Sequence, residues 1–111
     1  MTKNSLGYQV IEDNAGNLFL AVFDDNDECI YFASGFEHDP DNLQECITAL
    51  RNGGHPVQDR WESDFPDGYT PQQLYDKLTS YEYGWEIIAD ETGIYPERMG
   101  AAGRIAFGLD N

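Results

Sequence analysis

The sequence predicts an α+β fold in which an antiparallel β-meander of three to five strands carries two helices packed on one face. Residues Leu18–Phe36 contain two apolar runs of strand length, LFLAVF and ECIYFASGF, separated by a short acidic turn, which is the pattern of a β-hairpin. Two later stretches place apolar residues at helical spacing behind residues that cap helices. The 111 residues contain no linker or repeat, so we expect a single domain over residues 1–111.

The strand predictions rest on apolar runs that are bounded by turn residues. The turn Asp13–Asn17 contains Asn and Gly, which tolerate the left-handed conformations that tight hairpins require. The two central runs are apolar on nearly every residue, so we expect them to be covered on at least part of both faces. The expected strands are Tyr8–Glu12, Leu18–Phe23, Glu28–Phe36 and Trp85–Ala89.

A first helix is expected to begin at Asp39-Pro40, because Asp is a favoured N-cap and Pro suits the first helical position. Asn52-Gly53-Gly54 would end it. Its apolar stripe, at offsets 0, 3, 4 and 7, consists of Leu43, Cys46, Ile47 and Leu50.

A second helix is expected after Thr70, since Thr70 and Gln73 have the spacing of a capping box. Gly84 stands where a C-cap is expected. Beyond Ile94 the pattern is ambiguous: Pro96–Gly103 fits a short helix or a loop, and Ile105–Phe107 fits a last strand. The residues that the second helix would bury are Leu74, Tyr75, Leu78 and Tyr81.

Negative charge is the main functional signal in the sequence. The chain has 21 Asp and Glu against 6 Lys and Arg, a formal net charge of −15. Binding to nucleic acids or anionic membranes is disfavoured because it requires cations, whereas basic proteins are favoured as partners. From Asn4 to Leu50 there is no Lys or Arg. We therefore predict an acidic binding face made of Asp24, Asp25, Asp27, Glu28, Glu37, Asp39, Asp41 and Glu45.

Charge density decides whether such a face can imitate DNA. The scaling of surface with mass gives about 6,000 Å² of accessible surface, or about 400 Å² per net charge if the charge is evenly spread. Duplex DNA carries about one charge per 100 Å². DNA mimicry therefore requires that the acids cluster. The alternative is that the acids form a solvated surface that only keeps the protein soluble.

No pattern of residues points to catalysis, a metal or a cofactor. The turn that begins at Asp24 starts like a calcium loop, but Cys29 and Gly35 occupy the positions that would need Gly and Glu. The two cysteines and two histidines show neither metal-ligand spacing nor the signature of an activated nucleophile. Gly100–Gly103 has the spacing of a nucleic-acid-binding loop but lacks a basic platform. We expect a protein that is not an enzyme and has no cofactor.

The cysteines, Cys29 and Cys46, are expected to be reduced and buried, because residues 1–10 have no apolar core of the signal-peptide type and no run approaches membrane-spanning length. These features predict a cytoplasmic protein that is not associated with membranes.

A resemblance adds a biological setting to this picture. The blocks Tyr81–Ile87 and Ile94–Gly100 are similar to segments of uncharacterised small proteins from bacterial integrative elements. In its size and acidity the chain resembles the antirestriction and anti-CRISPR inhibitors of phages and mobile elements. The resemblance implies an accessory protein that binds a host or rival defence component, and it assigns no functional residue.

Two functional hypotheses follow from the sequence. The first is a non-enzymatic acidic protein that engages a basic, nucleic-acid-handling protein, such as a nuclease or DNA-binding protein, by DNA-mimic-like electrostatics. The second is a hydrophobic interaction module or homodimer, with the acids serving only solubility. Its interface would be an open sheet face or the aromatic loop containing Trp61, Phe65 and Tyr69.

Overall fold

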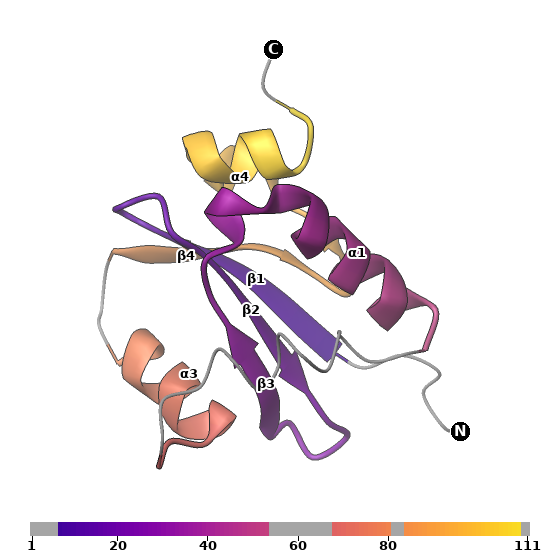
Figure 1. Cartoon of the computed structure of the whole chain (residues 1–111), viewed down its shortest axis with the longest axis vertical. Coiled ribbons are helices and arrows are strands. Elements are labelled where there is room, and N and C mark those ends of the chain that lie inside the picture. Colours follow the sequence, from indigo (N-terminus) through magenta and orange to yellow (C-terminus); the bar gives the residue numbers. More distant parts are fainter. Residues whose placement is uncertain (1–6, 54–67, 81–83, 110–111) are drawn as a thin grey trace.

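A five-stranded antiparallel sheet forms the centre of the computed structural model, which describes residues 7–53, 68–80 and 84–109 (Figure 1). In spatial order the strands are β3 (Cys29–Ala33), β2 (Leu18–Phe23), β1 (Gly7–Asp13), β4 (Trp85–Asp90) and β5 (Gly93–Ile94). The predicted α+β class is confirmed. The helices of the described residues are η1 (Phe36–His38), α1 (Pro40–Arg51), α3 (Pro71–Thr79), η2 (Pro96–Arg98) and α4 (Ala101–Ala106).

Strand boundaries follow the predicted pattern most closely in the centre of the sheet. Leu18–Phe23 begins and ends where expected, and β1 extends the predicted strand by one residue at each end. The third strand is shorter than predicted and ends at Ala33, because Gly35 adopts a φ of +85° and turns the chain into η1. A left-handed residue of this kind breaks the extended conformation.

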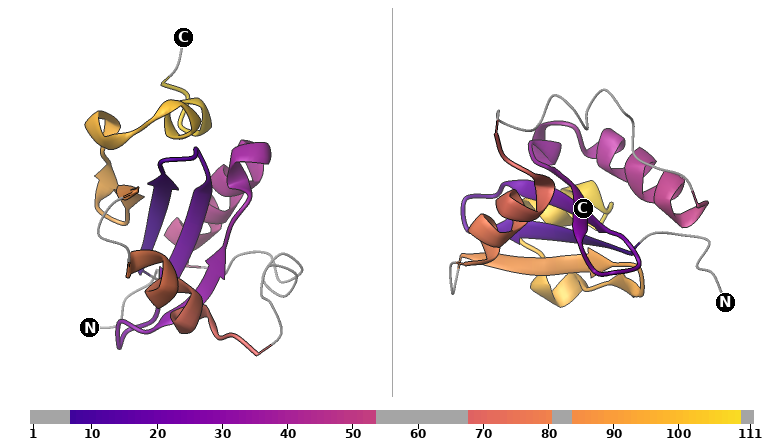
Figure 2. Two further views of the ribbon diagram at one scale, coloured as in Figure 1. Left: turned by 90° about the vertical axis from the view of Figure 1, so that its left-hand side faces the viewer. Right: turned by 90° about the horizontal axis from the view of Figure 1, so that it is seen from below.

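Two apolar layers lie on opposite faces of the sheet, and each has its own helix. The side chains of β2 alternate between them: Leu18, Leu20 and Val22 lie in the layer of α1, and Phe19, Ala21 and Phe23 lie in the layer of α3. In the left view of Figure 2, α3 stands in front of the sheet and α1 behind it. The prediction that both helices pack on one face is therefore wrong in this detail. Both faces of the central strands are apolar, so each requires a cover.

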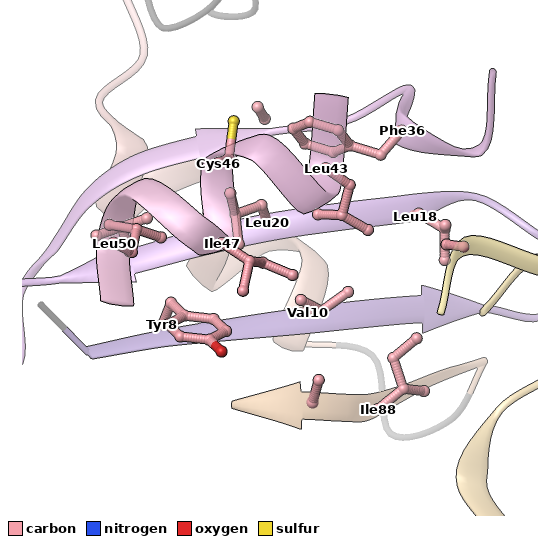
Figure 3. Close-up of a cluster of buried hydrophobic side chains, with 14 of the residues drawn as sticks. Tyr8, Val10, Leu18, Leu20, Phe36, Leu43, Cys46, Ile47, Leu50 and Ile88 are labelled. Atoms are coloured by element: carbon pink, nitrogen blue, oxygen red, sulfur yellow. The ribbon is translucent and has the colours of Figure 1, made fainter. Parts of the chain in front are cut away.

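The helix α1 forms as the sequence predicts. Asp39 caps it by accepting a hydrogen bond from the Asn42 N–H, and Pro40 occupies its first position. All four residues of the predicted stripe are buried and lie over Tyr8, Val10 and Leu20 of the sheet (Figure 3).

The helix α3 begins with the predicted capping box, in which Thr70 and Gln73 each accept a hydrogen bond from the other's backbone N–H. Gln72 accepts a 2.6 Å hydrogen bond from the Cys29 N–H of strand β3, and the Tyr75 hydroxyl donates to Gln9 of β1 at 2.9 Å. These bonds fasten α3 to the sheet. The helix ends at Thr79, so the expected stop at Gly84 is wrong, and Tyr81 lies outside the described residues.

A buried carboxylate, that of Glu12, holds the C-terminal segment on the sheet. Glu12 is 7% exposed and shares the α1 face with Tyr8 and Val10. Its Oε1 accepts hydrogen bonds from the backbone N–H groups of Gly100 at 2.8 Å and Gly103 at 3.2 Å, at the start of α4. Cβ atoms at these glycines would lie 2.6 Å and 2.5 Å from its carboxylate oxygens. The glycine pair therefore makes room for an acidic cap.

This arrangement settles the ambiguous tail. Residues 101–106 are the helix α4, and the predicted strand over Ile105–Phe107 is wrong. Among the described residues the last strand is instead the two-residue β5, which pairs with β4. The Gln44 side chain of α1 donates a 3.0 Å hydrogen bond to the carbonyl of Ala106, which links α4 to the first helix as well.

We expect Gly103→Ala to lower the free energy of unfolding by about 1–3 kcal/mol, although Ala is normally the better helix residue. The new methyl group would lie 2.5 Å from Glu12 Oε1 and 2.8 Å from Ile88 Cδ1, so the carboxylate must leave its hydrogen bonds. Urea unfolding measures the change. Gly7→Ala is the matched control, since a Cβ there meets only an ordinary contact at 3.5 Å. Equal effects of the two substitutions would contradict this packing.

Candidate functional site: the acid-lined end of the sheet

The acidic turn between β2 and β3 uses one of its carboxylates for its own structure. Asp24 Oδ1 accepts hydrogen bonds from the N–H groups of Asn26 at 2.9 Å and Glu28 at 3.0 Å. Asp27 adopts a left-handed φ of +62°, which Asp tolerates better than most residues. The side chains of Asp25, Asp27 and Glu28 are exposed. The turn therefore presents three carboxylates to solvent from a hydrogen-bonded frame.

A second acidic turn lies beside the first. The strands β2 and β4 both pair antiparallel with β1, so the turns that follow them meet at one end of the sheet. Asp24 and Asp27 from the first turn and Asp90 and Glu91 from the second line a pocket of about 330 Å³. Its walls are completed by residues of β1, β2 and α3, and none of the described residues that line it is Lys or Arg. We call this region the acidic end.

The two carboxylates of the second turn are also held in place. Asp90 accepts hydrogen bonds from the backbone N–H and the hydroxyl of Thr92, at 2.9 Å and 2.6 Å, and from the Tyr95 hydroxyl at 3.0 Å. Burial pushes the pKa of Asp90 upward, but these hydrogen bonds outweigh it and leave the pKa below its usual value. Glu91 accepts a hydrogen bond from the Tyr8 N–H at 3.2 Å. The acidic end is thus a set of positioned charges.

The other half of the predicted acidic face lies elsewhere. Glu37 accepts a 2.9 Å hydrogen bond from the Leu18 N–H at the start of β2, whereas Asp24 follows the end of that strand. Six residues of strand separate them by about 20 Å. Asp39 caps α1, and Asp41 and Glu45 are exposed on it. The structure therefore divides the eight predicted residues into two groups, because β3 carries the chain from one end of the sheet to the other.

Charge compensation within the described residues is slight. Within residues 7–53, 68–80 and 84–109, one pair of acidic and basic side chains lies closer than 4.0 Å. It is Glu37 and the exposed His38, at 3.3 Å. The Lys77 ammonium lies 5.9 Å from the ring of Tyr69, and the Arg98 guanidinium lies 4.4 Å from the ring of Tyr95. The carboxylates of the acidic end therefore have no cationic partner in the described part of the chain.

The residues of the alternative interface are only partly described. Trp61 and Phe65 lie outside the described residues. Tyr69 lies just before the N-cap of α3 and is 49% exposed. The other exposed large apolar residues of the described chain are Ile94 and Ile105, on β5 and α4.

The cysteines and the described histidine are not brought together. Cys29 is buried at the acidic end and donates a hydrogen bond to the Tyr31 carbonyl at 3.3 Å, while Cys46 is buried on α1. His38 is exposed beside Glu37 at the opposite end of the sheet, and His55 lies outside the described residues. Burial raises the pKa of the Cys29 thiol to about 11, which leaves very little reactive thiolate at neutral pH.

The raised pKa of Cys29 predicts a loss of stability in alkaline solution. An unfolded thiol releases its proton near pH 9, whereas the folded thiol keeps it until about pH 11, so folding is penalised as the pH rises between these values. The unfolding free energy should fall by about 2 kcal/mol more in the wild type than in Cys29→Ala over this interval. Urea unfolding at several pH values measures the difference, and parallel pH profiles would contradict the assignment.

Two general properties complete the description of this part of the chain. No helix within the described residues is both long and apolar enough to cross a membrane. In the same residues, no group of three or more His, Cys, Asp or Glu side chains is arranged to hold a metal ion.

Comparison of the chain with protein-family models, curated proteins and solved structures finds no match.

Proposed function

We propose that this protein is a non-enzymatic binding protein of the cytoplasm whose acidic end engages a basic protein. The single observation that carries the proposal is that Asp24 and Asp27 meet Asp90 and Glu91 around one pocket, with no Lys or Arg among its described lining residues. Acids gathered from turns distant in sequence create a local field that attracts cationic surfaces. The resemblance to small proteins of mobile elements supports a partner that handles nucleic acids, such as a nuclease.

Local clustering is essential to this proposal. The accessible surface is 6638 Å², so a net charge of −15 corresponds to one charge per roughly 440 Å², against about 100 Å² for duplex DNA. A uniform distribution would thus fall about fourfold short. The acidic end places four carboxylates around about 330 Å³, with the exposed Asp25 and Glu28 beside them. The mechanism is electrostatic steering followed by occupation of a basic groove.

Affinity capture tests the proposal. Tagged protein is incubated with bacterial lysate at about 50 mM and at about 300 mM salt, and the bound proteins are identified. We expect basic nucleic-acid-handling proteins to be captured at low salt and released at the higher concentration, because screening shortens the reach of exposed charges. Capture that resists salt, or none at all, would contradict the proposal.

The hydrophobic module remains the alternative, and light scattering coupled to size exclusion separates it from the acidic binder. A monomer at both salt concentrations is the expected result. A dimer that persists at about 300 mM salt would support the apolar interface instead, since hydrophobic association is not weakened by screening.

A further inference from the structure

A second concave surface lies at the other end of β1, away from the acidic end. It is a groove of about 820 Å³ between the turn after β1, the start of β4 and the segment that joins η2 to α4. The charged residues among its described lining are Glu12, Asp13, Glu86 and Arg98, which together carry a net charge of −2. Trp85, at the start of β4, is half-buried. We call it the Glu12 groove.

Within the described part of the chain, one oxygen of the buried Glu12 carboxylate accepts hydrogen bonds and the other does not. Oε1 accepts both backbone hydrogen bonds, from Gly100 and Gly103. Oε2 accepts none from the described residues, and it lies on the side of Gly100, an exposed residue that lines the groove. A carboxylate oxygen of a side chain that is 7% exposed is stabilised by a hydrogen-bond donor. The groove is the side from which a donor can reach it.

A second carboxylate faces the same space. Glu86 is the cross-strand partner of Glu12, so the two side chains lie on the same face of the sheet, and Glu86 is exposed. Like charges directly opposite one another on a sheet repel. The groove's own cation, Arg98, is directed elsewhere: its guanidinium stacks on Tyr95 and approaches the Ile87 carbonyl at 3.4 Å. A cation that enters the groove would relieve this repulsion.

We propose that the Glu12 groove binds the guanidinium group of an arginine in a polypeptide. A planar fork of N–H donors can bond to Glu12 Oε2 and the Glu86 carboxylate together, which a single ammonium does less well. The groove is far larger than one side chain and is open to solvent, which leaves room for the residues that flank the arginine.

An acetylated and amidated glycine–arginine–glycine peptide is the probe. The amide resonances of Gly100 and Gly103, whose N–H groups bond to Glu12, report its binding at low salt. We expect saturable shifts of both signals. The citrulline analogue, which is neutral and nearly isosteric, should bind at least about tenfold more weakly, and the lysine analogue severalfold more weakly. Methylguanidinium alone should also bind severalfold more weakly than the arginine peptide, since it lacks the flanking residues.

Substitutions locate the site. Glu86→Gln and Glu12→Gln should each weaken the arginine peptide at least about fivefold, and Glu97→Gln, a matched change of an exposed acid outside the groove, should not. If Glu12→Gln perturbs folding, the exposed Glu86 still decides the matter. Equal binding of the arginine and citrulline peptides, equal effects of Glu86→Gln and Glu97→Gln, or equal binding of methylguanidinium and the peptide would overturn the proposal.

This inference deepens the proposed function, because a basic partner would supply the arginine, but the two can fail separately. The peptide titration does not require the partner, and partner capture through the acidic end does not require the groove. Peptide binding without capture would contradict the proposed function alone, and capture without peptide binding would contradict the groove alone.

Discussion

Glu12→Ala is expected to lower the free energy of unfolding by about 3 kcal/mol, one of the two largest effects that we predict. The substitution removes the charged acceptor of the Gly100 and Gly103 N–H groups, and it leaves a cavity between the sheet and α4. The start of α4 would then lose the contact that fastens it. Urea unfolding followed by circular dichroism measures the change.

Glu86→Ala is the matched control for Glu12→Ala. Glu86 lies opposite Glu12 on the same sheet face, but it is exposed and its side chain makes no hydrogen bond to the described residues. Its replacement should change the unfolding free energy by less than about 0.5 kcal/mol. If the two substitutions destabilise the protein equally, the buried carboxylate does not hold the C-terminal segment.

The second large effect concerns binding. The double substitution Asp25→Lys and Glu28→Lys should weaken binding of the basic partner by roughly a hundredfold at low salt, and by much less at about 300 mM salt. Both side chains are exposed and make no hydrogen bond among the described residues, so folding should be unaffected. Asp24 and Asp27 are left unchanged because the first bonds to the turn and the second has a left-handed backbone. Calorimetric titration of the captured partner measures the loss.

The effect of net charge on binding must be separated from the effect of where the charges lie. The double substitution Glu45→Lys and Glu97→Lys changes the charge of the protein by the same amount at exposed sites away from the acidic end. It should weaken binding no more than a few-fold, through the long-range field. Equal losses of affinity in the two double variants would show that the acids act only through the net charge of the protein and that the acidic end is not the binding site.

Much of the fold follows from local patterns in the sequence. The strand Leu18–Phe23, the cap at Asp39 and the capping box at Thr70 were all predicted from residues adjacent in the chain. The positions of the helices relative to the sheet were not predicted correctly. The apolar residues on both faces of β2 already implied two covered faces, and that observation conflicts with the prediction of both helices on one face.

The C-terminal segment shows where local patterns fail. The cap of α4 is a side chain 88 residues away, so nothing near Gly100 in the sequence marks the start of a helix. The sequence left Pro96–Gly103 open between a short helix and a loop, because it does not show that the glycines are required by the close approach of Glu12. The signal that could have suggested the contact was Glu12 itself, an acid that shares a strand face with Tyr8 and Val10.

The candidate site was half predicted for a similar reason. The acids Asp24–Glu28 stand out because they form a turn, but Asp90 and Glu91 join them only through the strand order β2-β1-β4. That order cannot be derived from the lengths and polarity of the strands. Conversely, Glu37 is close to Glu28 in the sequence but distant from it in space, because the strand β3 separates the two.

Competition with DNA tests the central claim most directly. The captured partner is bound to a fluorescent DNA duplex at about 50 mM salt, and the protein is added while fluorescence anisotropy is followed. We expect the wild type and the Glu45→Lys, Glu97→Lys variant to displace the duplex, and the Asp25→Lys, Glu28→Lys variant not to do so. A complex in which partner, duplex and protein coexist would contradict occupation of a DNA-binding groove by the acidic end.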